Sequence, residues 1–491
     1  MKVLVANRGE IAIRIFRTCR ELDIPSVAVY TEPDELGLHL RYADEAIAIG
    51  PAAGYADQDL IIDTALRSGA DAIHPGYGFL SENAAFARRV EATGLTFIGP
   101  RPQTILQMGD KLCARREARK SGLPVLEGSD DPLPRQIPYD VVSNVIYPVL
   151  VKAAAGGGGR GIYLARNPQE LDRMITSARR EALAVFGDDS VYLEPMVSQA
   201  RHIEVQIFGD GEGQVLCLGD RECSIQRRRQ KLIEEAPAPA LEEDLRAAIH
   251  SSAVRLAKDL MYRSLGTVEF LLDAEGHYYF IEVNPRIQVE HPVTEMITGL
   301  DLVRAQLLQA MTGRLQLKQE QIEVRGAAIE ARILAEDAEQ GFLPATGEIM
   351  YLKEPGGIGV RVDSSLYVGM PVRSDYDSLL AKVIAYGDVR FMAISRLRRA
   401  LKEYQIGGVA TDLEFLQQVI DSPQFLTGRF DTTYLDHFEP ESARENDDLG
   451  KEIAAAAALY AYQQRGTGKE LQVQQTGHWL QAAWLEQMRG K

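Results

Sequence analysis

Residues 267–291 read TVEFLLDAEGHYYFIEVNPRIQVEH, and two apolar runs separated by a polar turn in this stretch predict a β-hairpin. A turn centred between Glu275 and Gly276 places Glu269 directly opposite Glu282 on the paired strand. Opposed side chains lie ~5 Å apart at Cβ, so two carboxylates in these positions repel each other unless a cation lies between them. The hairpin therefore predicts a cation site as well as a strand pair.

Asn284 follows Glu282 by two residues, so its side chain points to the same face of the strand. Two carboxylates and an amide oxygen are ligands that suit Mg²⁺, which binds few carboxylates together with substrate phosphates. Solvated surface glutamates are the alternative, but the flanking residues are almost all large and apolar. A slip of the strand register would separate the two carboxylates.

The segment after the hairpin carries Arg286, Gln288 and Glu290 at alternate positions. In an extended backbone these three side chains share one face. A guanidinium that holds a small oxyanion and a carboxylate that accepts its proton make a compact acid–base site. An ordinary charged loop is the alternative, and the position directly after the predicted metal-binding hairpin argues against it.

A glycine-rich loop lies earlier in the chain. Residues 149–152 read VLVK, residues 156–161 read GGGGRG and residues 162–165 read IYLA. Consecutive glycines let backbone amides approach phosphate groups closely. The loop formally matches G-x-G-x-x-G, but a strand follows it and no Gly-Lys-Ser/Thr is present, which disfavours a dinucleotide fingerprint and a Walker A loop. A strand–loop–strand unit that covers phosphates fits better than these motifs or a plain hairpin turn.

The N-terminal region predicts a parallel sheet. Residues 2–6 and 26–30 are apolar runs, and the residues between them recur at helical spacing. This βαβ unit indicates an α/β fold, mixed α+β in part, with ligand sites at the carboxyl ends of the strands. Changes in composition divide the chain into residues 1–110, 111–315, 324–436 and a tail at 437–491, which we expect to be helical.

Composition limits the classes of partner. The 491 residues carry a net charge of −16, which argues against binding to nucleic acid or to an anionic membrane surface. The basic run QRRRQK at 226–231 lies in this acidic chain, so neutralising phosphates is a better interpretation of it than contacting nucleic acid.

Four cysteines without a CxxC pair indicate neither a disulfide framework nor a zinc site. With no signal peptide or transmembrane run, we expect a cytoplasmic protein.

Five blocks of sequence, in this order, resemble the biotin carboxylases of the ATP-grasp superfamily. They read ANRGEIA (6–12), HPGYGFLSEN (74–83), MGDK (108–111), EEAP (234–237) and QVEHPVTE (288–295). The resemblance runs from residue 1 to about residue 436. It implies a pre-ATP-grasp domain, an ATP-grasp domain with a mobile glycine-rich lid at about 130–200, and a biotin carboxylase C-terminal domain.

The resemblance also implies roles for individual residues. The catalytic positions are the bicarbonate-holding Arg286, the base Glu290, and Lys231 and Arg332, which match residues near carboxyphosphate and the biotin enolate. The nucleotide-binding positions are Lys111, Lys152, Gly157, Gly158, Gly159, Glu194, His202, Gln226, Gln288 and Val289. The ligands of Mg²⁺ or Mn²⁺ match Glu269, Glu282 and Asn284, the residues that the hairpin pattern indicates independently.

The activity that this resemblance implies is ATP-dependent carboxylation of biotin by bicarbonate through carboxyphosphate. No Ala-Met-Lys-Met motif occurs, so we expect the biotin on a separate carboxyl carrier protein, with a carboxyltransferase subunit as a further partner. Family members are commonly homodimers. The alternatives are an ATP-grasp ligase with another acceptor, a non-catalytic scaffold that binds a carrier, and, more distantly, an NAD-dependent oxidoreductase.

Two positions depart from the family pattern. Arg229 stands where relatives often carry His or Asn, and Leu334 replaces a frequent Asn. The tail resembles extensions of some two-subunit carboxylases only loosely, and a stripe of Leu480, Ala483, Trp484 and Met488 suits packing on the core or docking a partner equally well. The sequence does not identify the final carboxyl acceptor.

Overall fold

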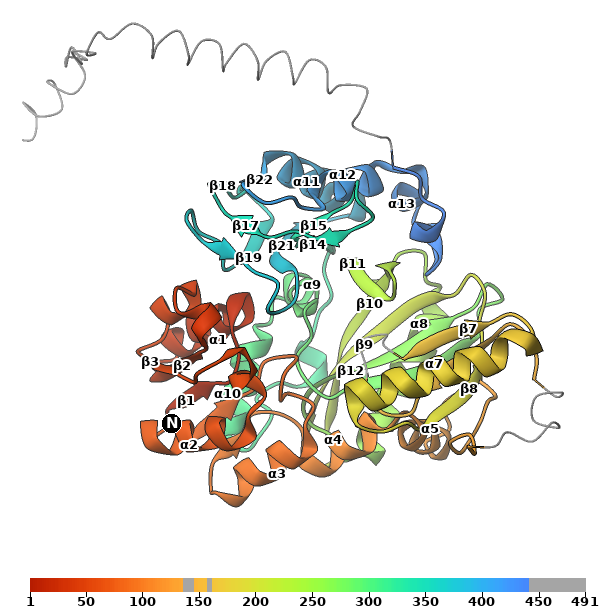
Figure 1. The fold of residues 1–491 in the computed structure, drawn as a ribbon, viewed down its shortest axis with the longest axis horizontal. Coiled ribbons are helices and arrows are strands. Elements are labelled where there is room, and N and C mark those ends of the chain that lie inside the picture. Colours follow the sequence, from red (N-terminus) through yellow and green to blue (C-terminus); the bar gives the residue numbers. More distant parts are fainter. Residues whose placement is uncertain (136–144, 157–160, 441–491) are drawn as a thin grey trace, which may run out of the picture. The chain divides into compact units, whose positions relative to one another are not determined.

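A computed structural model describes the chain at residues 1–135, 145–156 and 161–440. These residues belong to one unit, Met1–Pro440, whose path is drawn in Figure 1. The predicted glycine contacts Gly157, Gly158 and Gly159 lie outside the described residues, and so does the predicted helical tail from residue 441 onwards.

The first five strands form a parallel sheet, which confirms the fold class predicted from the N-terminal βαβ pattern. Their order is β3-β2-β1-β4-β5. The strands are β1 (Val3–Val5), β2 (Ser26–Tyr30), β3 (Glu45–Ala48), β4 (Ala72–His74) and β5 (Thr96–Phe97). The helices that accompany them are α1 (Gly9–Glu21), α2 (Gln58–Ser68), α3 (Ala84–Ala92) and α4 (Pro102–Gly109). The loop after β4 leads toward the candidate site described below, as expected at the carboxyl end of a parallel strand.

An eight-stranded sheet dominates the rest of the described chain, with the order β13-β12-β9-β10-β11-β14-β21-β19. Its strands are β9 (Arg201–Asp210), β10 (Val215–Arg227), β11 (Gln230–Ala236), β12 (Arg263–Leu272), β13 (Tyr278–Asn284), β14 (Ala327–Leu334), β19 (Val360–Ser364) and β21 (Leu379–Gly387). The pairing of β11 with β14 carries the sheet across residues 316–323, where the sequence predicts a domain boundary. Residues of both regions can therefore contribute to one site.

The β12–β13 hairpin has the predicted pairing where it matters for the cation site and a different one near the turn. Glu269 pairs with Glu282, but Phe270 pairs with Phe280, so Ile281 has no partner and forms a bulge. The turn is consequently centred on Glu275 rather than between Glu275 and Gly276. The reason is local: the Asp273 carboxylate accepts the amide hydrogens of residues 275 and 277 at 3.0 and 2.8 Å, and the Asp273 amide bonds to the carbonyl of residue 277.

The glycine-rich region lies in a small antiparallel sheet, β7-β6-β8, of β6 (Val149–Ala153), β7 (Ile162–Ala165) and β8 (Val191–Pro195). The strand–loop–strand prediction is thus confirmed, since Lys152 pairs with Ile162 across the loop. Helix α7 (Pro168–Phe186) packs on this sheet and is well delimited. Asn167 caps its start, Pro168 occupies the first turn, and Gly187 ends it with a φ of +75°.

Helices and short strands complete the unit. The other helices of the described residues are α5 (Lys111–Lys120), α8 (Glu243–Asp259), α9 (His291–Thr298), α10 (Leu302–Thr312), α11 (Arg390–Glu403), α12 (Leu413–Asp421) and α13 (Pro423–Thr427). The short strands pair as β15 (Glu336–Asp337) with β16 (Leu343–Pro344), β17 (Gly347–Glu348) with β20 (Pro371–Val372), and β18 (Tyr351–Lys353) with β22 (Gln405–Gly407). Single 3-10 turns lie at Glu32–Asp34, Leu38–Arg41, Ala52–Ala56, Gln319–Gln321 and Tyr434–Asp436. In the described part of the chain, no helix combines the length and the apolar character needed to cross a bilayer.

Candidate active site

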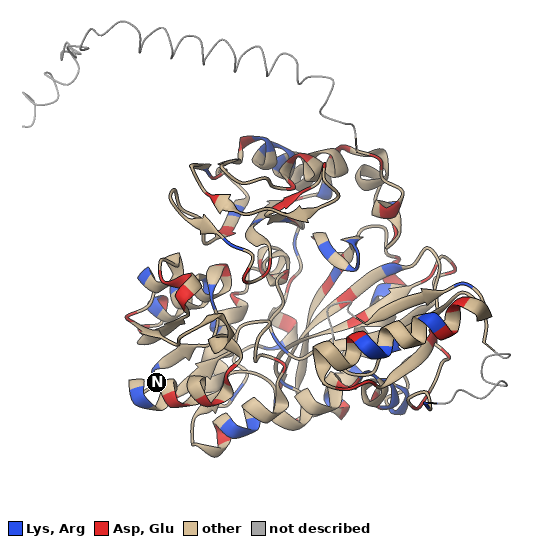
Figure 2. Ribbon diagram, viewed as in Figure 1, with Lys and Arg blue, Asp and Glu red and all other residues tan. Residues whose placement is uncertain are grey.

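Four charged side chains form a row across neighbouring strands of the large sheet. Glu282 on β13 is opposite Glu269 on β12, Glu269 is opposite Glu204 on β9, and Glu204 is opposite Arg221 on β10. The Glu204 and Arg221 side chains are fully buried. Acidic and basic segments lie side by side in the middle of this sheet (Figure 2). Since unpaired charge in such a position is costly, the row needs cations between its carboxylates.

Lys231 on β11 is the cation at the centre of the row. Its ammonium lies 2.6 Å from a Glu204 oxygen, 3.0 Å from a Glu269 oxygen and 2.6 Å from a Glu290 oxygen. Burial lowers the pKa of Lys231, but the negative groups around it outweigh burial and raise the pKa well above its ordinary value. The lysine is therefore charged, and it links the hairpin to the segment that precedes α9.

Glu290 is held between two cations. One carboxylate oxygen contacts Lys231, and the other accepts a hydrogen bond from the Arg332 guanidinium on β14 at 2.9 Å. Arg332 also donates to Glu234 on β11 at 2.6 Å, so its position is fixed from two sides. Burial raises the pKa of Glu290, but Lys231 and Arg332 outweigh it and hold the pKa below its ordinary value. The carboxylate is therefore ionised and able to accept a proton.

Glu269 contacts three further polar side chains of the site. Its oxygens accept hydrogen bonds from the Asn284 amide at 2.7 Å and the Gln288 amide at 3.0 Å, and one lies 2.8 Å from His202 Nε2. Burial raises the pKa of Glu269, but Lys231 and His202 lower it well below its ordinary value. The pKa of His202 changes in the opposite direction. Burial lowers the pKa of His202, but the Glu269 carboxylate outweighs burial and raises it above the ordinary value.

Glu282 is the carboxylate of the row with the weakest neutralisation. Among the residues that the structure describes, the Lys111 ammonium is the cation paired with it, at 3.7 Å. Burial raises the pKa of Glu282, Lys111 lowers it, and the charges of Glu269 and Glu82 raise it again, so the net shift is upward. A divalent cation between Glu269 and Glu282 would relieve this repulsion, so the predicted donor set of Glu269, Glu282 and Asn284 fits a hard, oxygen-liganded ion.

A second set of potential ligands fits a metal ion less well. The ligand atoms of His202, Glu204 and Glu269 lie within 4.8 Å of one another. However, Arg221 and Lys231 already neutralise Glu204, whose pKa they lower to about 2 against the effect of burial. An added cation there would compete with two fixed ones.

Arg286 joins the hydrogen-bonded network of the site, but the backbone around it differs from the prediction. The extended conformation expected for residues 286–290 is wrong, because the chain turns at residues 289–290 to begin α9 at His291. Arg286 instead donates to Asn284 Oδ1 at 3.1 Å and to Glu82 at 2.6 Å, and Gln288 and Glu290 meet through Glu269 and Lys231. The three side chains thus belong to one hydrogen-bonded network without sharing a strand face.

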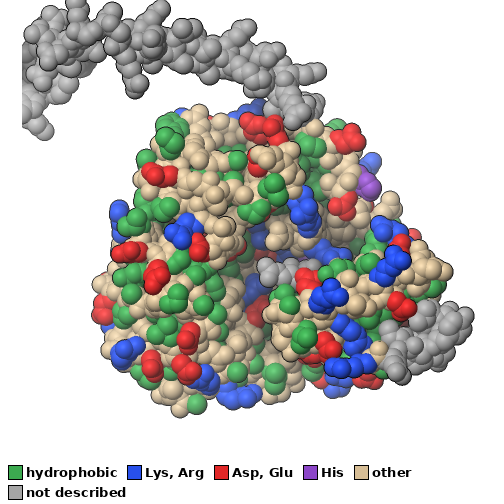
Figure 3. Space-filling view, in the orientation of Figure 1, with side chains coloured by type: hydrophobic (Ala, Val, Ile, Leu, Met, Phe, Trp, Pro, Cys, Tyr) green, Lys and Arg blue, Asp and Glu red, His purple; other side chains and the backbone are tan. Residues whose placement is uncertain are grey.

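The predicted nucleotide contacts divide into several groups. Lys152 and Arg115 both pair with the Glu194 carboxylate on β8, and Lys111 donates to the carbonyl of Gly156 at the start of the glycine loop. Gln226 pairs with Lys231 in the β10–β11 ladder. The Val289 carbonyl accepts a hydrogen bond from Lys382 at 2.8 Å. Lys and Arg side chains gather in a hollow at the centre of one face of the unit (Figure 3).

Comparison with known proteins identifies the family. The N-terminal domain model of biotin carboxylase matches residues 1–105, the ATP-binding domain model of the carbamoyl-phosphate synthase L chain matches residues 110–318, and the biotin carboxylase C-terminal domain model matches residues 330–437. Biotin carboxylase 1 of Bacillus subtilis is 46% identical over 443 residues, which cover 89% of this chain and 98% of that protein. The chain belongs to the biotin carboxylase family.

Solved structures of biotin carboxylases share the fold. The biotin carboxylase domain dimer of Hydrogenobacter thermophilus 2-oxoglutarate carboxylase, in complex with MgADP, ADP and bicarbonate, superposes with a TM-score of 0.86 at 46% identity, covering 89% of this chain and 97% of that one. The Campylobacter jejuni biotin carboxylase in complex with a β,γ-ATP compound gives a TM-score of 0.85 at 40% identity, covering 89% and 98%. The biotin carboxylase of Nostoc sp. is 48% identical over 438 residues, 88% of this chain and 98% of that protein.

The structure shows the contacts of the two residues that depart from the biotin carboxylase pattern, Arg229 and Leu334. Arg229, at a φ of +66°, donates a hydrogen bond to the carbonyl of Ile162, the first residue of β7 after the glycine loop. Leu334 is buried in the hydrophobic cluster around β14, and its amide donates to Asp412 at 2.8 Å. Neither side chain takes part in the charge network described above.

The sequence assigns no role to several members of this charge network. Glu204 and Arg221 form its buried centre, Glu234 holds Arg332, and Glu82 reaches Arg286 from the N-terminal region. Glu82 and Glu234 lie in two of the blocks quoted above, residues 74–83 and 234–237. A further signal was available, since residues 202–207 read HIEVQI, an alternation that puts His202, Glu204 and Gln206 on one face of β9. Their partners could not be read from it, because Arg221 and Glu269 come from other strands.

Arg221 is expected to contribute strongly to stability. Its guanidinium donates to Glu204, Gln206, Thr294, Thr267 and Gln288. Replacing Arg221 with Met leaves the buried Glu204 without its closest partner, so we expect the free energy of unfolding to fall by about 3–5 kcal/mol. Urea denaturation of Arg221→Met checks this against Arg304→Met, a change at an exposed position that should cost less than about 0.5 kcal/mol. Equal denaturation midpoints for the two variants would contradict the assigned role.

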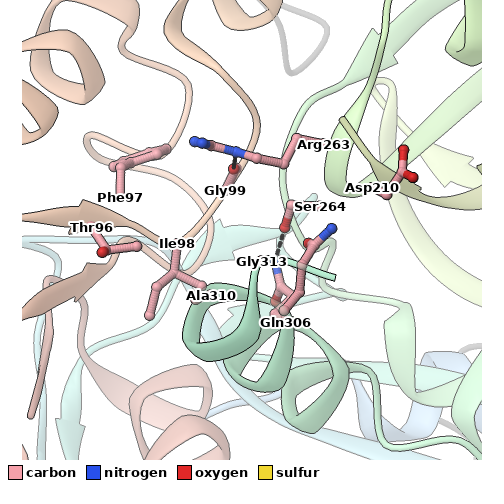
Figure 4. A pocket seen from close by; sticks show the side chains of 11 residues that line it. Thr96, Phe97, Ile98, Gly99, Asp210, Arg263, Ser264, Gln306, Ala310 and Gly313 are labelled. Atoms are coloured by element: carbon pink, nitrogen blue, oxygen red, sulfur yellow. Dashed lines mark hydrogen bonds between the residues drawn. The ribbon is translucent and has the colours of Figure 1, made fainter. Parts of the chain in front are cut away.

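A small cavity elsewhere does not belong to the site. It has a volume of about 120 Å³ and lies between residues 96–99, the start of β12 and α10 (Figure 4). Gln306 of α10 points into it and donates to Ser264 Oγ at 3.1 Å. The residues that line it include none of the predicted catalytic, nucleotide or metal positions within the described chain. The cavity is therefore separate from the charge network.

Proposed function

We propose that this chain carboxylates biotin on a separate carrier protein, using ATP and bicarbonate. The observation that carries the proposal is Glu290, an ionised carboxylate fixed between Lys231 and Arg332 beside two opposed glutamates. A reaction that joins bicarbonate to a phosphoryl group needs a base, cations around the anions, and a metal site for the nucleotide in one place. The network supplies residue types suited to all three.

In the first step, Glu290 accepts the proton of bicarbonate while a bicarbonate oxygen attacks the γ-phosphorus of ATP. The bond from that phosphorus to ADP breaks and carboxyphosphate forms. Arg286 holds the bicarbonate, because a guanidinium offers paired donors to a planar oxyanion. Glu82 supports Arg286 from the N-terminal region through the 2.6 Å hydrogen bond, so it is a positioning residue in this scheme.

In the second step, the carboxyl group passes from carboxyphosphate to N1′ of biotin, the bond between that carboxyl group and phosphate breaks, and the leaving phosphate takes up the N1′ proton. Lys231 lies among three carboxylates and stabilises the negative charge that the intermediate brings. Arg332 stabilises the enolate form of the biotin ureido group. Both cations are largely buried, with exposed fractions of 12% and 15% for their side chains, which favours exclusion of water from carboxyphosphate.

The nucleotide is assigned to residues on both sides of the glycine loop. Lys111, Lys152 and His202 would contact its phosphates, and Glu194 would lie beside the adenine. Lys152 is now paired with Glu194, so we expect it to exchange this partner for phosphate when ATP binds. Gly157, Gly158, Gly159, Gln226, Gln288 and Val289 complete the proposed set.

Glu269, Glu282 and Asn284 would hold Mg²⁺ or Mn²⁺. The ion would neutralise phosphate charge on the nucleotide when it is bound. The fit rests on the incomplete neutralisation of Glu282, whose cationic partner among the described residues, Lys111, is 3.7 Å away. The chain's own part in this is to keep the two carboxylates opposed, through the pairing of β12 with β13.

The assignment of partners follows from the same chemistry. A biotin carboxyl carrier protein or biotinyl subunit would deliver biotin, and a carboxyltransferase subunit would use the product. We also propose a homodimer, a form in which the domain of the Hydrogenobacter relative occurs. The division into domains at 1–110, 111–315 and 324–436, with a mobile lid at about 130–200, remains a proposal, as does the cytoplasmic location.

Free biotin is the simplest test of this function. ADP release from MgATP should require bicarbonate and should rise when biotin is added. An ATP-grasp ligase with a different acceptor would cleave ATP without responding to biotin, and a non-catalytic scaffold would release no ADP. Either of those results would refute the proposal.

Arg286→Ala should weaken the use of bicarbonate while leaving nucleotide binding largely intact. Loss of a charged hydrogen-bonding partner costs roughly 1.5–3 kcal/mol, so the rate at low bicarbonate should fall by about 10- to 100-fold. Nucleotide affinity, measured by calorimetry on the same variant, should stay within about threefold, because the nucleotide is assigned to other residues. A collapse of nucleotide affinity with little effect on bicarbonate dependence would mean that Arg286 has another role.

A further inference from the structure

Glu234 on β11 and Glu330 on β14 are a second pair of opposed glutamates in the large sheet. They are direct partners in the antiparallel ladder between these two strands. Opposed side chains lie ~5 Å apart at Cβ, so the pair repeats the arrangement of Glu269 and Glu282 on the hairpin. Glu234 and Glu330 are both completely buried, with an exposed fraction of 0% for each residue.

Three of the four carboxylate oxygens of this pair have no hydrogen-bond partner among the residues that the structure describes. They are Oε2 of Glu234 and both oxygens of Glu330. The fourth, Oε1 of Glu234, accepts a hydrogen bond from the Arg332 guanidinium at 2.6 Å. Burial of an ionised carboxylate without a donor is costly, and two such charges side by side repel each other. The pair therefore needs both a positive charge and a hydrogen-bond donor.

The lysine beside this pair is engaged with other groups. Lys382 on β21 lies diagonally across the ladder from Glu330, because β21 pairs Lys382 with Arg332. Its ammonium lies 3.2 Å from a Glu10 oxygen and donates a hydrogen bond to the Val289 carbonyl at 2.8 Å. The lysine is therefore committed to Glu10, and the oxygens of Glu330 gain no hydrogen bond from it.

Helix α9 covers the same face of the sheet and adds no positive charge. The helix packs in one hydrophobic cluster with Ala328 of β14, which lies two residues before Glu330 and on the same face. The titratable side chains of α9 are His291 and Glu295. Burial, with neighbouring cations, lowers the pKa of His291 well below its ordinary value, so this imidazole is neutral. Glu295 carries a negative charge, which two arginines neutralise.

One proton bound by the pair supplies the missing charge and the missing donor together. A protonated Glu330 is neutral, and its hydroxyl can donate to the unpartnered Oε2 of Glu234. Burial raises the pKa of Glu330, Lys382 opposes this effect, and the charge of Glu234 adds to it, so the pKa lies well above its ordinary value. A metal ion fits less well, because the candidate ligand groups in the described part of the chain include neither glutamate.

We propose that Glu330 is a positioning residue that carries a proton, donates a hydrogen bond to Glu234 and thereby holds Glu234 against Arg332. Arg332 in turn donates a hydrogen bond to Glu290, the assigned base, at 2.9 Å. A continuous chain of hydrogen bonds then connects Glu330 to the base. The role of Glu330 in the reaction rests on the proposed carboxylase function, whereas the proton on the pair does not.

Infrared spectroscopy tests the proton directly. The full chain in deuterated buffer at neutral pH is compared with Glu330→Gln, in which a neutral amide of similar shape replaces the carboxyl group. We expect the carbonyl band of protonated carboxyl groups to be weaker in Glu330→Gln than in the unmodified chain. Glu275→Gln, a change at an exposed position, should leave the band unchanged. A band of equal size in Glu330→Gln and the unmodified chain would overturn the proposal, whatever the activity of the protein.

The rate of biotin-dependent ADP release tests the positioning role. Glu330→Gln keeps a neutral donor for Glu234, so its rate should stay within about threefold of the unmodified chain. Glu330→Met is equally uncharged but has no donor, so its rate should fall by about 10-fold, as expected for the loss of a hydrogen bond to a charged group. Nucleotide affinity, measured by calorimetry, should stay within about threefold in both variants and reports that they are folded.

The two measurements separate this inference from the proposed function. A biotin response in the unmodified chain with equal rates in the two variants would refute the role of Glu330 and leave the carboxylase function intact. An unmodified chain that does not respond to biotin would refute the carboxylase function, and the infrared band would then decide whether the pair carries the proton.

Discussion

Glu290→Gln is expected to slow bicarbonate-dependent ATP cleavage by about 10²- to 10⁴-fold, the usual contribution of a general base. Glutamine has the shape of glutamate but cannot accept the bicarbonate proton. The cations around it keep other partners, because Lys231 still contacts Glu204 and Glu269, and Arg332 still contacts Glu234. The variant should therefore fold, and steady-state kinetics at saturating MgATP and bicarbonate would measure the loss.

Nucleotide binding is the control for this variant. The affinity of Glu290→Gln for MgATP should remain within about threefold of the unmodified chain, since the fall is assigned to proton transfer. A variant that cleaves ATP at more than about a tenth of the original rate would show that Glu290 is not the base. Loss of ATP binding would instead place Glu290 in the nucleotide site.

Glu282→Gln is expected to raise the Mg²⁺ concentration needed for half-maximal activity by about 10- to 100-fold, as changes to the surroundings of a metal site commonly do. The substitution removes one of the two charges that face each other across β12 and β13. Within the described part of the chain, Glu282 pairs with Lys111 at 3.7 Å, a looser contact than the ion pairs of Lys231, so we expect the loss of its charge to disturb the fold little. Titration of activity with Mg²⁺ at fixed ATP measures the shift.

Glu275→Gln provides the matched control on the same hairpin. Glu275 lies at the centre of the turn and is exposed, so loss of its charge should leave the Mg²⁺ dependence unchanged. If both variants shift the Mg²⁺ dependence equally, the effect reflects the overall charge of the hairpin. If neither variant shifts it, the metal ion does not bind between Glu269 and Glu282.

The parts of the fold that depend on local pattern were predictable from the sequence. The parallel N-terminal sheet, the strands around the glycine loop and the opposition of Glu269 and Glu282 are all confirmed. The centre of the hairpin turn was not predictable. The Asp273 carboxylate accepts hydrogen bonds from two backbone amides of the turn, and the bulge at Ile281 shifts the strand pairing between the turn and Glu269. Alternation of apolar residues carries no information about such side-chain-to-backbone hydrogen bonds.

The rest of the site depends on strand order, which a single sequence does not display. Glu204 meets Arg221 and Glu269 only because β9 lies between β10 and β12. Glu82 reaches Arg286 from a loop 204 positions earlier in the chain. The extended form predicted for residues 286–290 failed because α9 begins directly after them, and a helix start requires a turn.

Transfer of labelled carbon from bicarbonate to biotin tests the central claim most directly. The chain is incubated with MgATP, ¹⁴C-bicarbonate and free biotin, and carboxybiotin is trapped as its methyl ester. We predict labelled carboxybiotin in proportion to the ADP released in response to biotin, and its loss in Glu290→Gln. ADP release without label in biotin, or equal labelling by Glu290→Gln, would contradict the account.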